Sequence, residues 1–201
     1  MNFVDIFYYI FIVLLFSAGY ACWKGAPWVP TRKNDVERFL KLADIKPGQK
    51  FYDLGCGDGR LVIAAAKMGA DATGFELSLA QYLHTKINIL LSVIPAPARG
   101  WSALGGKAGI QRKMQRPWIP NQVGNDIIKI KFQDFWNVNL SDANIVYLFL
   151  MQGVYPKLKT KFEKELKPGT KVIVYAWPIE GWTPIKIDQS SNSLPIYLYQ
   201  R

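Results

Sequence analysis

Apolar and polar residues alternate along the chain in runs that predict short strands joined by helices. Nearly continuous apolar runs bounded by Gly, Pro or Asn predict strands, and apolar residues three or four apart predict helices. Strands are predicted at residues 50–54, 72–76, 127–132, 144–150, 171–175 and 194–199, and helices at 36–43, 61–68, 79–94 and 155–166. This order, closed by a hairpin that begins at Gly181, predicts an α/β fold. We expect a doubly wound, seven-stranded sheet with an antiparallel C-terminal hairpin.

A long apolar stretch precedes these elements. Ile6 to Trp23 contains no charged residue, and aromatic residues flank it at both ends. This pattern is typical of a single transmembrane helix, so residues 1–24 are assigned to a membrane anchor and residues 25–201 to the main domain. A cleaved signal peptide is the alternative, because small residues stand near the end of the stretch. The first residues, however, carry an acid and no Lys or Arg, whereas signal peptides begin with a basic segment.

Basic residues on the C-terminal side of the stretch predict its orientation. Lys24, Arg32 and Lys33 follow the apolar run. Positive charges collect on the cytoplasmic side of single spans, so we expect the main domain on the cytoplasmic side, or the matrix side in a mitochondrion.

Composition narrows the function classes. The chain of 201 residues can hold one ordinary domain with a small appendage, and its formal net charge of +10 indicates an acidic partner, either phospholipid headgroups or nucleic acid. It has one histidine and two cysteines, which excludes a Ser-His-Asp set and a His-based metal site. No disulfide is expected between Cys22 and Cys56, and no metal is expected.

A glycine-rich turn follows the first predicted strand. Glycines recur at alternate positions and a helix-forming run follows at once. Glycine permits positive φ and close approach of a ligand, and the start of the helix presents unpaired N–H groups. The binding candidates in this turn are Asp53, Gly55, Cys56, Gly57, Asp58 and Gly59.

The charge of the turn indicates which ligand it binds. Dinucleotide sites use G-x-G-x-x-G to hold a pyrophosphate, but here the spacing is G-x-G-x-G, and Asp53 and Asp58 would repel phosphate. The two acids suit a ligand that carries an ammonium, a sulfonium and one carboxylate. S-adenosylmethionine has that charge pattern, and we expect it as the cofactor.

The glycine-rich turn and the strand before it resemble motif I of the class I methyltransferases. Glu76 ends the next apolar run about 20 residues later, where the resemblance implies that a carboxylate accepts both ribose hydroxyls. The resemblance also implies that an acid after the third strand accepts the adenine amino group, which makes Asp134 a candidate, with Phe135 or Trp136 near the ring. An ordinary turn aspartate is the alternative for Asp134. The implied fold is the Rossmann-like methyltransferase sheet.

A narrower resemblance comes from the order of segments. Val29-Pro-Thr31, a helix, and then Asp-Leu-Gly-Cys-Gly-Asp-Gly-Arg resemble the membrane-anchored protein-lysine methyltransferases that modify the c-ring protein of ATP synthase and the adenine nucleotide translocase. In that family the proline-threonine segment lies over the cofactor, which makes Pro30 and Thr31 candidates. From the residues alone they are equally a rigid linker.

Residues 95–125 depart from the family pattern. This stretch is rich in Gly, Pro and Trp and carries five cations without an acid, namely Arg99, Lys107, Arg112, Lys113 and Arg116. Because the domain is expected to be tethered, the insert is interpreted as a basic flap on an anionic lipid surface rather than a nucleic-acid site. A solvated, disordered segment is the alternative.

The methyl acceptor follows from the resemblance alone, which implies an accessible lysine of a protein, in or near the same bilayer. The candidates for an aromatic acceptor channel lie at the ends of the fourth and fifth strands: Met151, Gln152, Tyr155, Trp177 and Pro178. Ordinary packing is the alternative role for these residues. Two other functions stay open at this stage, methylation of a lipid or small hydrophobic molecule and a non-catalytic membrane adaptor with the same fold.

Overall fold

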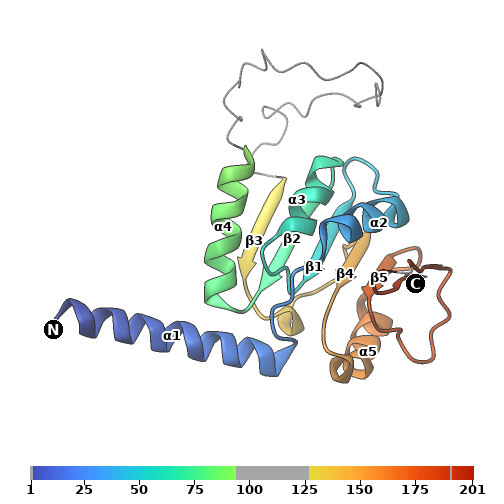
Figure 1. Cartoon of the computed structure of the whole chain (residues 1–201). Coiled ribbons are helices and arrows are strands. Elements are labelled where there is room, and N and C mark those ends of the chain that lie inside the picture. The colour runs from blue at the N-terminus through green and yellow to red at the C-terminus, as the bar shows by residue number, and fades with distance from the viewer. Residues whose placement is uncertain (1, 94–126, 191) are drawn as a thin grey trace, which may run out of the picture.

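The computed structural model describes residues 2–93, 127–190 and 192–201, which form one mixed sheet with helices on both faces (Figure 1). Its strands are β1 (Lys50–Leu54), β2 (Asp71–Glu76), β3 (Ile128–Phe132), β4 (Ile145–Leu148), β5 (Lys171–Tyr175), β6 (Lys186–Asp188) and β7 (Ile196–Gln200). Its helices are α1 (Phe3–Lys24), α2 (Lys33–Ala43), α3 (Arg60–Lys67), α4 (Leu79–Val93) and α5 (Tyr155–Glu165), with short 3-10 turns η2 (Phe135–Asn137) and η3 (Gln152–Val154).

The seven strands lie in the order β3-β2-β1-β4-β5-β7-β6. Pairs from β3 to β5 are parallel, whereas β7 runs antiparallel to both β5 and β6. The predicted seven-stranded α/β sheet with an antiparallel C-terminal hairpin is therefore confirmed. The strand order reverses between β1 and β4, and open α/β sheets bind ligands at the carboxyl ends of the strands at such a point.

The core fills both faces of the sheet because the central strands are apolar on both sides. Along β4, Ile145 and Tyr147 pack in the cluster with Phe39 of α2, and Val146 and Leu148 pack in the cluster with α5. All four β4 side chains are buried. This double burial is the reason that the run is apolar without alternation.

One buried carboxylate holds α2 against the C-terminal part of the chain. Asp35 is 1% exposed and accepts hydrogen bonds from Tyr175 Oη at 2.6 Å, from Ser193 Oγ at 2.5 Å and from Arg38 at 2.8 Å. Arg38 also pairs with Asp188 of β6. These bonds fix the start of α2 and with it the end of the extended segment that joins α1 to α2.

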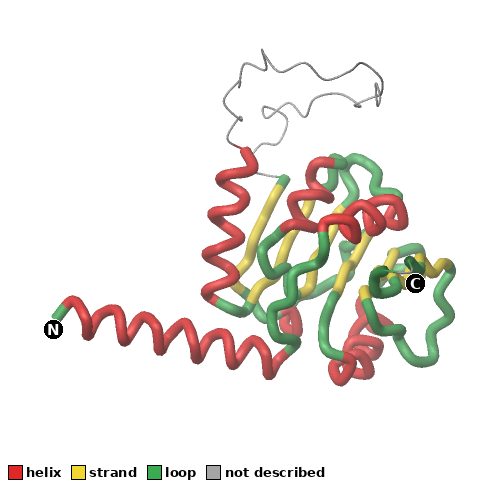
Figure 2. The backbone as a smooth tube through the Cα atoms, in the orientation of Figure 1, coloured by secondary structure: helices red, strands yellow, loops and turns green. Residues whose placement is uncertain are grey.

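α1 is the one helix in the described residues that is long and apolar enough to cross a membrane by length and composition. It ends at Lys24, and residues 25–32 are extended because Pro27 and Pro30 cannot continue it. The N-terminal part of α1 projects past α4, away from the sheet (Figure 2). The predicted basic insert at residues 95–125 lies outside the residues that the structure describes.

Candidate functional site

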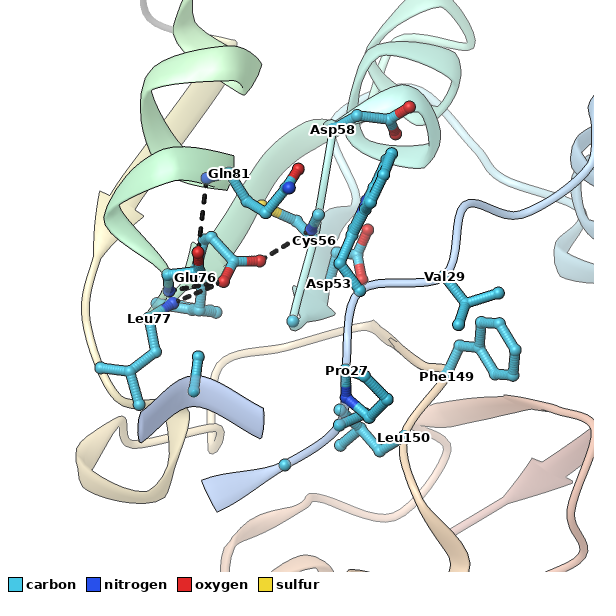
Figure 3. A pocket seen from close by; sticks show the side chains of 18 of the residues that line it. Pro27, Val29, Asp53, Cys56, Asp58, Glu76, Leu77, Gln81, Phe149 and Leu150 are labelled. Atoms are coloured by element: carbon cyan, nitrogen blue, oxygen red, sulfur yellow. Dashed lines mark hydrogen bonds between the residues drawn. The ribbon is translucent and has the colours of Figure 1, made fainter. Parts of the chain in front are cut away.

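A pocket opens at the carboxyl ends of β1 and β2, beside the reversal of strand order. The extended segment after α1 crosses it, and the first turns of α3 and α4 form its other walls. Figure 3 shows Glu76 and Leu77 on one side, Phe149 and Leu150 on the other, and Asp53 between them. The pocket is therefore built from segments that lie far apart in the sequence.

The glycines of the β1–α3 turn are needed for different structural reasons. All three have positive φ, and a Cβ atom on Gly57 would lie 2.8 Å from the Trp28 indole, which crosses the turn. A Cβ atom on Gly59 would meet Thr85 Cγ2 of α4 at 2.4 Å. Gly57 thus lets the Trp28 indole pack against the turn, whereas Gly59 lets α3 and α4 pack closely.

Glu76 joins the two ligand-facing turns. Its Oε2 accepts the backbone N–H of Gly57 at 2.9 Å, and its Oε1 accepts those of Leu77 at 2.9 Å and Ser78 at 2.8 Å. Burial raises the pKa of Glu76, and these three N–H donors lower it in part. The carboxylate therefore fixes the backbone of both turns besides facing the pocket.

Asp53 is the buried acid that lacks a protein partner. Its residue is 2% exposed, and no hydrogen bond or ion pair to its carboxyl is found among the described residues. Burial raises the pKa of Asp53 well above its usual range, and the nearby carboxyls of Glu76 and Asp58 raise it further. A buried carboxyl without a donor is costly, so this position favours a cationic or hydrogen-bond-donating ligand.

Asp58 differs from Asp53 because Arg60 neutralises it. The Arg60 guanidinium binds the Asp58 carboxylate and also donates to the Thr31 carbonyl oxygen. The ion pair thereby ties the glycine turn to the extended segment. Asp58 would therefore repel phosphate less than its sequence position indicates, whereas no Lys or Arg among the described residues forms an ion pair with Asp53 or Glu76.

The extended segment is bonded to the domain at both ends. Met151 N–H donates to the Gly25 carbonyl oxygen at 3.2 Å, and Trp136 Nε1 donates to that of Lys24 at 3.2 Å. At the other end, the Thr31 hydroxyl lies 3.4 Å from Tyr147 Oη. The segment therefore covers the pocket from a fixed position.

Most of the predicted cofactor residues lie together. Those that line the pocket are Pro30, Thr31, Asp53, Gly55, Cys56, Gly57, Asp58 and Glu76. Gly59 and Asp134 are not among the lining residues. Asp134 accepts the Trp136 backbone N–H at 3.0 Å and lies 3.7 Å from Lys24 Nζ, while its neighbour Phe135 lines the pocket. A direct ligand role for each of these residues stays a prediction.

The acceptor candidates divide into two groups. Gln152, Tyr155 and Pro178 line a second pocket between η3, α5 and the chain after β5. Met151 and Trp177 are exposed and are not among its lining residues. The Tyr155 hydroxyl is buried and lies near the Leu150 backbone, and it makes no hydrogen bond of standard geometry in the described part of the chain.

Several lining residues were not predicted from the sequence. α1 contributes Ala18, Ala21 and Lys24, and the start of α4 contributes Gln81. The side-chain oxygen of Gln81 is buried without a donor among the residues described. The position of Gln81 shortly after the second strand could have predicted its place in the pocket, because the carboxyl ends of parallel strands meet at one edge of the sheet. Nothing in the sequence of α1 indicated that its last turns would line the pocket.

Comparisons with known proteins indicate the family of the chain. The model of the family described as the ANTKMT methyltransferase domain matches residues 111–186. A protein-lysine N-methyltransferase of Saccharolobus islandicus (strain REY15A) is 34% identical over 178 residues, which are 86% of this chain and 92% of the relative. The adenine nucleotide translocase lysine N-methyltransferase of Mus musculus is 31% identical over 80% of this chain, which spans 57% of that relative's length.

A solved structure extends the comparison to the cofactor. The structure of an RNA methyltransferase from Salinibacter ruber, in complex with S-adenosyl-L-homocysteine, aligns with a TM-score of 0.67 and 26% identity. The alignment covers 86% of this chain and 93% of that one.

Proposed function

The chain belongs to the protein-lysine N-methyltransferase family, and on that premise we propose that it is membrane-anchored and methylates a lysine of a protein in or near the same bilayer. It is an S-adenosylmethionine-dependent methyltransferase. The non-catalytic adaptor is therefore set aside. The observation that carries the proposal is the pocket with two buried acids, Asp53 and Glu76, under the segment that continues from α1.

The residues of the pocket fit the cofactor. Among the described residues, the Asp53 carboxyl and the Gln81 side-chain oxygen have no hydrogen-bond donor, and both residues line the pocket. We assign Asp53 and Glu76 to the cationic and hydroxyl groups of the ligand. When bound, S-adenosylmethionine supplies a methyl group carried on a sulfonium.

The chain must then hold a neutral amine and exclude water. Burial disfavours the charged form of an amine, so an apolar acceptor pocket lowers the pKa of an entering lysine. We assign this role to the second pocket, whose lining includes Lys159 and Glu180 besides apolar residues, and where the buried Tyr155 hydroxyl can hydrogen-bond a nitrogen. Gln152 and Pro178 line the same pocket and would position the side chain.

Transfer of labelled methyl groups in membrane extracts tests the acceptor class. We expect label from S-adenosylmethionine in the protein fraction, at lysine, because the family acts on that side chain. The Asp53→Asn variant is the control, since it is expected to lose cofactor affinity. Label confined to the lipid fraction would refute the assignment and support the lipid-methylating alternative.

The membrane anchor is proposed from α1. The helix is apolar over its whole circumference, and Val13 and Leu15 on its projecting part are 55% and 59% exposed. Water is a poor environment for such a helix, whereas a bilayer suits it. The basic residues Lys24, Arg32 and Lys33 support a location of the domain on the cytoplasmic or matrix side.

Charged residues in the projecting part should abolish membrane insertion. Two acids near the middle of the projecting part cost about 5 to 7 kcal/mol together, so a protein with Ile10→Asp and Phe11→Asp, both exposed on α1, should stay soluble when vesicles are floated, while the unmodified chain floats. Ile185→Asp is the matched control, because Ile185 is 59% exposed but lies on the sheet edge. Flotation of the double variant with the vesicles would count against the anchor.

A further inference from the structure

The outer face of α4 is apolar although no described residue covers it. Leu83, Ile87, Leu90 and Leu91 follow helical spacing and are 48%, 55%, 60% and 61% exposed. The opposite face is used by the fold, since Tyr82 and Ile89 pack on the core and Thr85 contacts the glycine turn. A helix that is apolar on both faces is expected to be covered on both.

α1 passes beneath the start of α4 at a defined residue. Ser17 Oγ accepts the Leu79 backbone N–H at 2.8 Å, and the stretch from Ala18 to Lys24 contributes three residues to the cofactor pocket. Figure 1 shows α1 running crosswise to α4 and extending past it, away from the sheet. If the projecting part of α1 is inserted perpendicular to the plane of a bilayer, the surface of that bilayer therefore lies along the outer face of α4.

The projecting part of α1 is shorter than the hydrocarbon core of a bilayer. Phe3 to Phe16 spans about 14 residues, or about 21 Å of helix, whereas a hydrocarbon core is about 30 Å thick. Ser17 is hydrogen-bonded to the domain, and Ala18, Ala21 and Lys24 line its pocket, so this part of α1 is held on the domain and does not span the bilayer. A helix face that sinks about 5 to 10 Å into the headgroup and acyl boundary removes this deficit.

We propose that the outer face of α4 (Leu83, Ile87, Leu90 and Leu91) is a second membrane contact that lies in the headgroup and acyl boundary of the bilayer that holds α1. The inference rests on the proposed anchor. Charge agrees with it, because α4 contains no Asp or Glu, and its one Lys or Arg, Lys86, stands beside the apolar face. A lysine in the headgroup and acyl boundary is attracted to anionic headgroups.

Two contacts fix the catalytic domain in a way that one helix does not. α1 and the start of α4 both line the cofactor pocket, so immersion of α4 sets the height and tilt of that pocket relative to the bilayer. An acceptor lysine is then selected by its distance from the membrane surface as well as by its sequence.

Fluorescence quenching on the full chain tests the contact. In a Cys22→Ser background, a nitrobenzoxadiazole label is placed on Ile87→Cys, and the protein is reconstituted with phosphatidylcholine, phosphatidylglycerol and spin-labelled lipid. Native Cys56 stays, because it is buried and burial raises the pKa of its thiol. Ile185→Cys is the matched control on an isoleucine that is 59% exposed, and Phe11→Cys reports on α1.

We expect spin-labelled lipid to quench the label at 87 several-fold more strongly than the label at 185. Quenching at 11 with none at 87 would leave the anchor in place and overturn the second contact. Blue-shifted emission at 87 without quenching would also overturn it, because protein and not lipid would then cover the face. Absence of quenching at 11 would remove the anchor itself.

A second variant tests the link between α4 and α1. Ile87→Asp with Leu91→Asp should move the label at 11 toward the surface, so that quenchers near the headgroups act more strongly and deep quenchers less. Cofactor binding should be retained, which separates this effect from misfolding. An unchanged depth at 11 would contradict the two-point attachment.

Discussion

Replacement of Asp53 by asparagine is expected to weaken the binding of S-adenosylmethionine by about 10- to 100-fold, without loss of stability. The buried carboxyl has no donor among the described side chains or backbone groups, so a cationic ligand is its expected partner. A hydrogen bond to a charged group contributes about 1.5 to 3 kcal/mol, which corresponds to that range. Calorimetric titration measures the affinity directly.

The stability of the Asp53→Asn variant should increase, although its cofactor affinity decreases. Because the pKa of Asp53 is raised in the folded protein, the folded state holds the proton more tightly than the unfolded chain does. The contribution of the Asp53 carboxyl to stability is fully present below its pKa in the unfolded chain. This contribution is lost as the pH rises from there through the pKa in the folded protein. The asparagine variant lacks this loss, so its advantage in thermal midpoint should grow as the pH rises above about 4, the pKa of an aspartate in the unfolded chain.

The affinity of the unmodified enzyme should rise over the same pH range, because the carboxylate form binds a cation. The variant should show a flatter pH profile. Asp142→Asn is the matched control: Asp142 pairs with Lys50 and Tyr52 of β1, outside the pocket. Unchanged affinity in the Asp53 variant would refute the role assigned to this residue.

Replacement of Glu76 by glutamine is expected to lower cofactor affinity by about 100-fold or more and also to destabilise the domain. The two carboxylate oxygens accept three backbone N–H groups, whereas an amide has one oxygen and directs its NH₂ group at a donor. A buried donor left unpaired costs about 1 to 3 kcal/mol. For a chain of this size that lowers the thermal midpoint by about 2 to 12 °C.

Glu163→Gln provides the control for this variant, because Glu163 accepts the Trp182 indole N–H at an exposed position on α5. Differential scanning calorimetry and titration with the cofactor give both quantities. A Glu76→Gln protein that kept its thermal midpoint and lost only affinity would show that the bonds to the two turns are dispensable. One that kept affinity would contradict a role in the site.

The sequence determined the fold class and most of the residues that line the predicted cofactor site. Strand length, glycine spacing and proline position act locally, so β1, the turn after it, β2 and the extended segment could all be predicted before their neighbours were known. The rule that parallel strands end at one edge then brought Asp53 and Glu76 together. The resemblance to lysine methyltransferases depended on the same local motif.

Only the tertiary structure decided what each side chain does there. It showed that Arg60 neutralises Asp58, that Gly59 is required by Thr85, and that the last turns of α1 line the pocket. Each of these contacts joins side chains through the packing of separate elements, and the periodicity of one segment carries no information about the rotamers and charges that another segment brings against it. For the same reason the sequence of α4 is typical of a core helix, and the apolar face that it leaves uncovered is seen only once α1 and the sheet are placed around it.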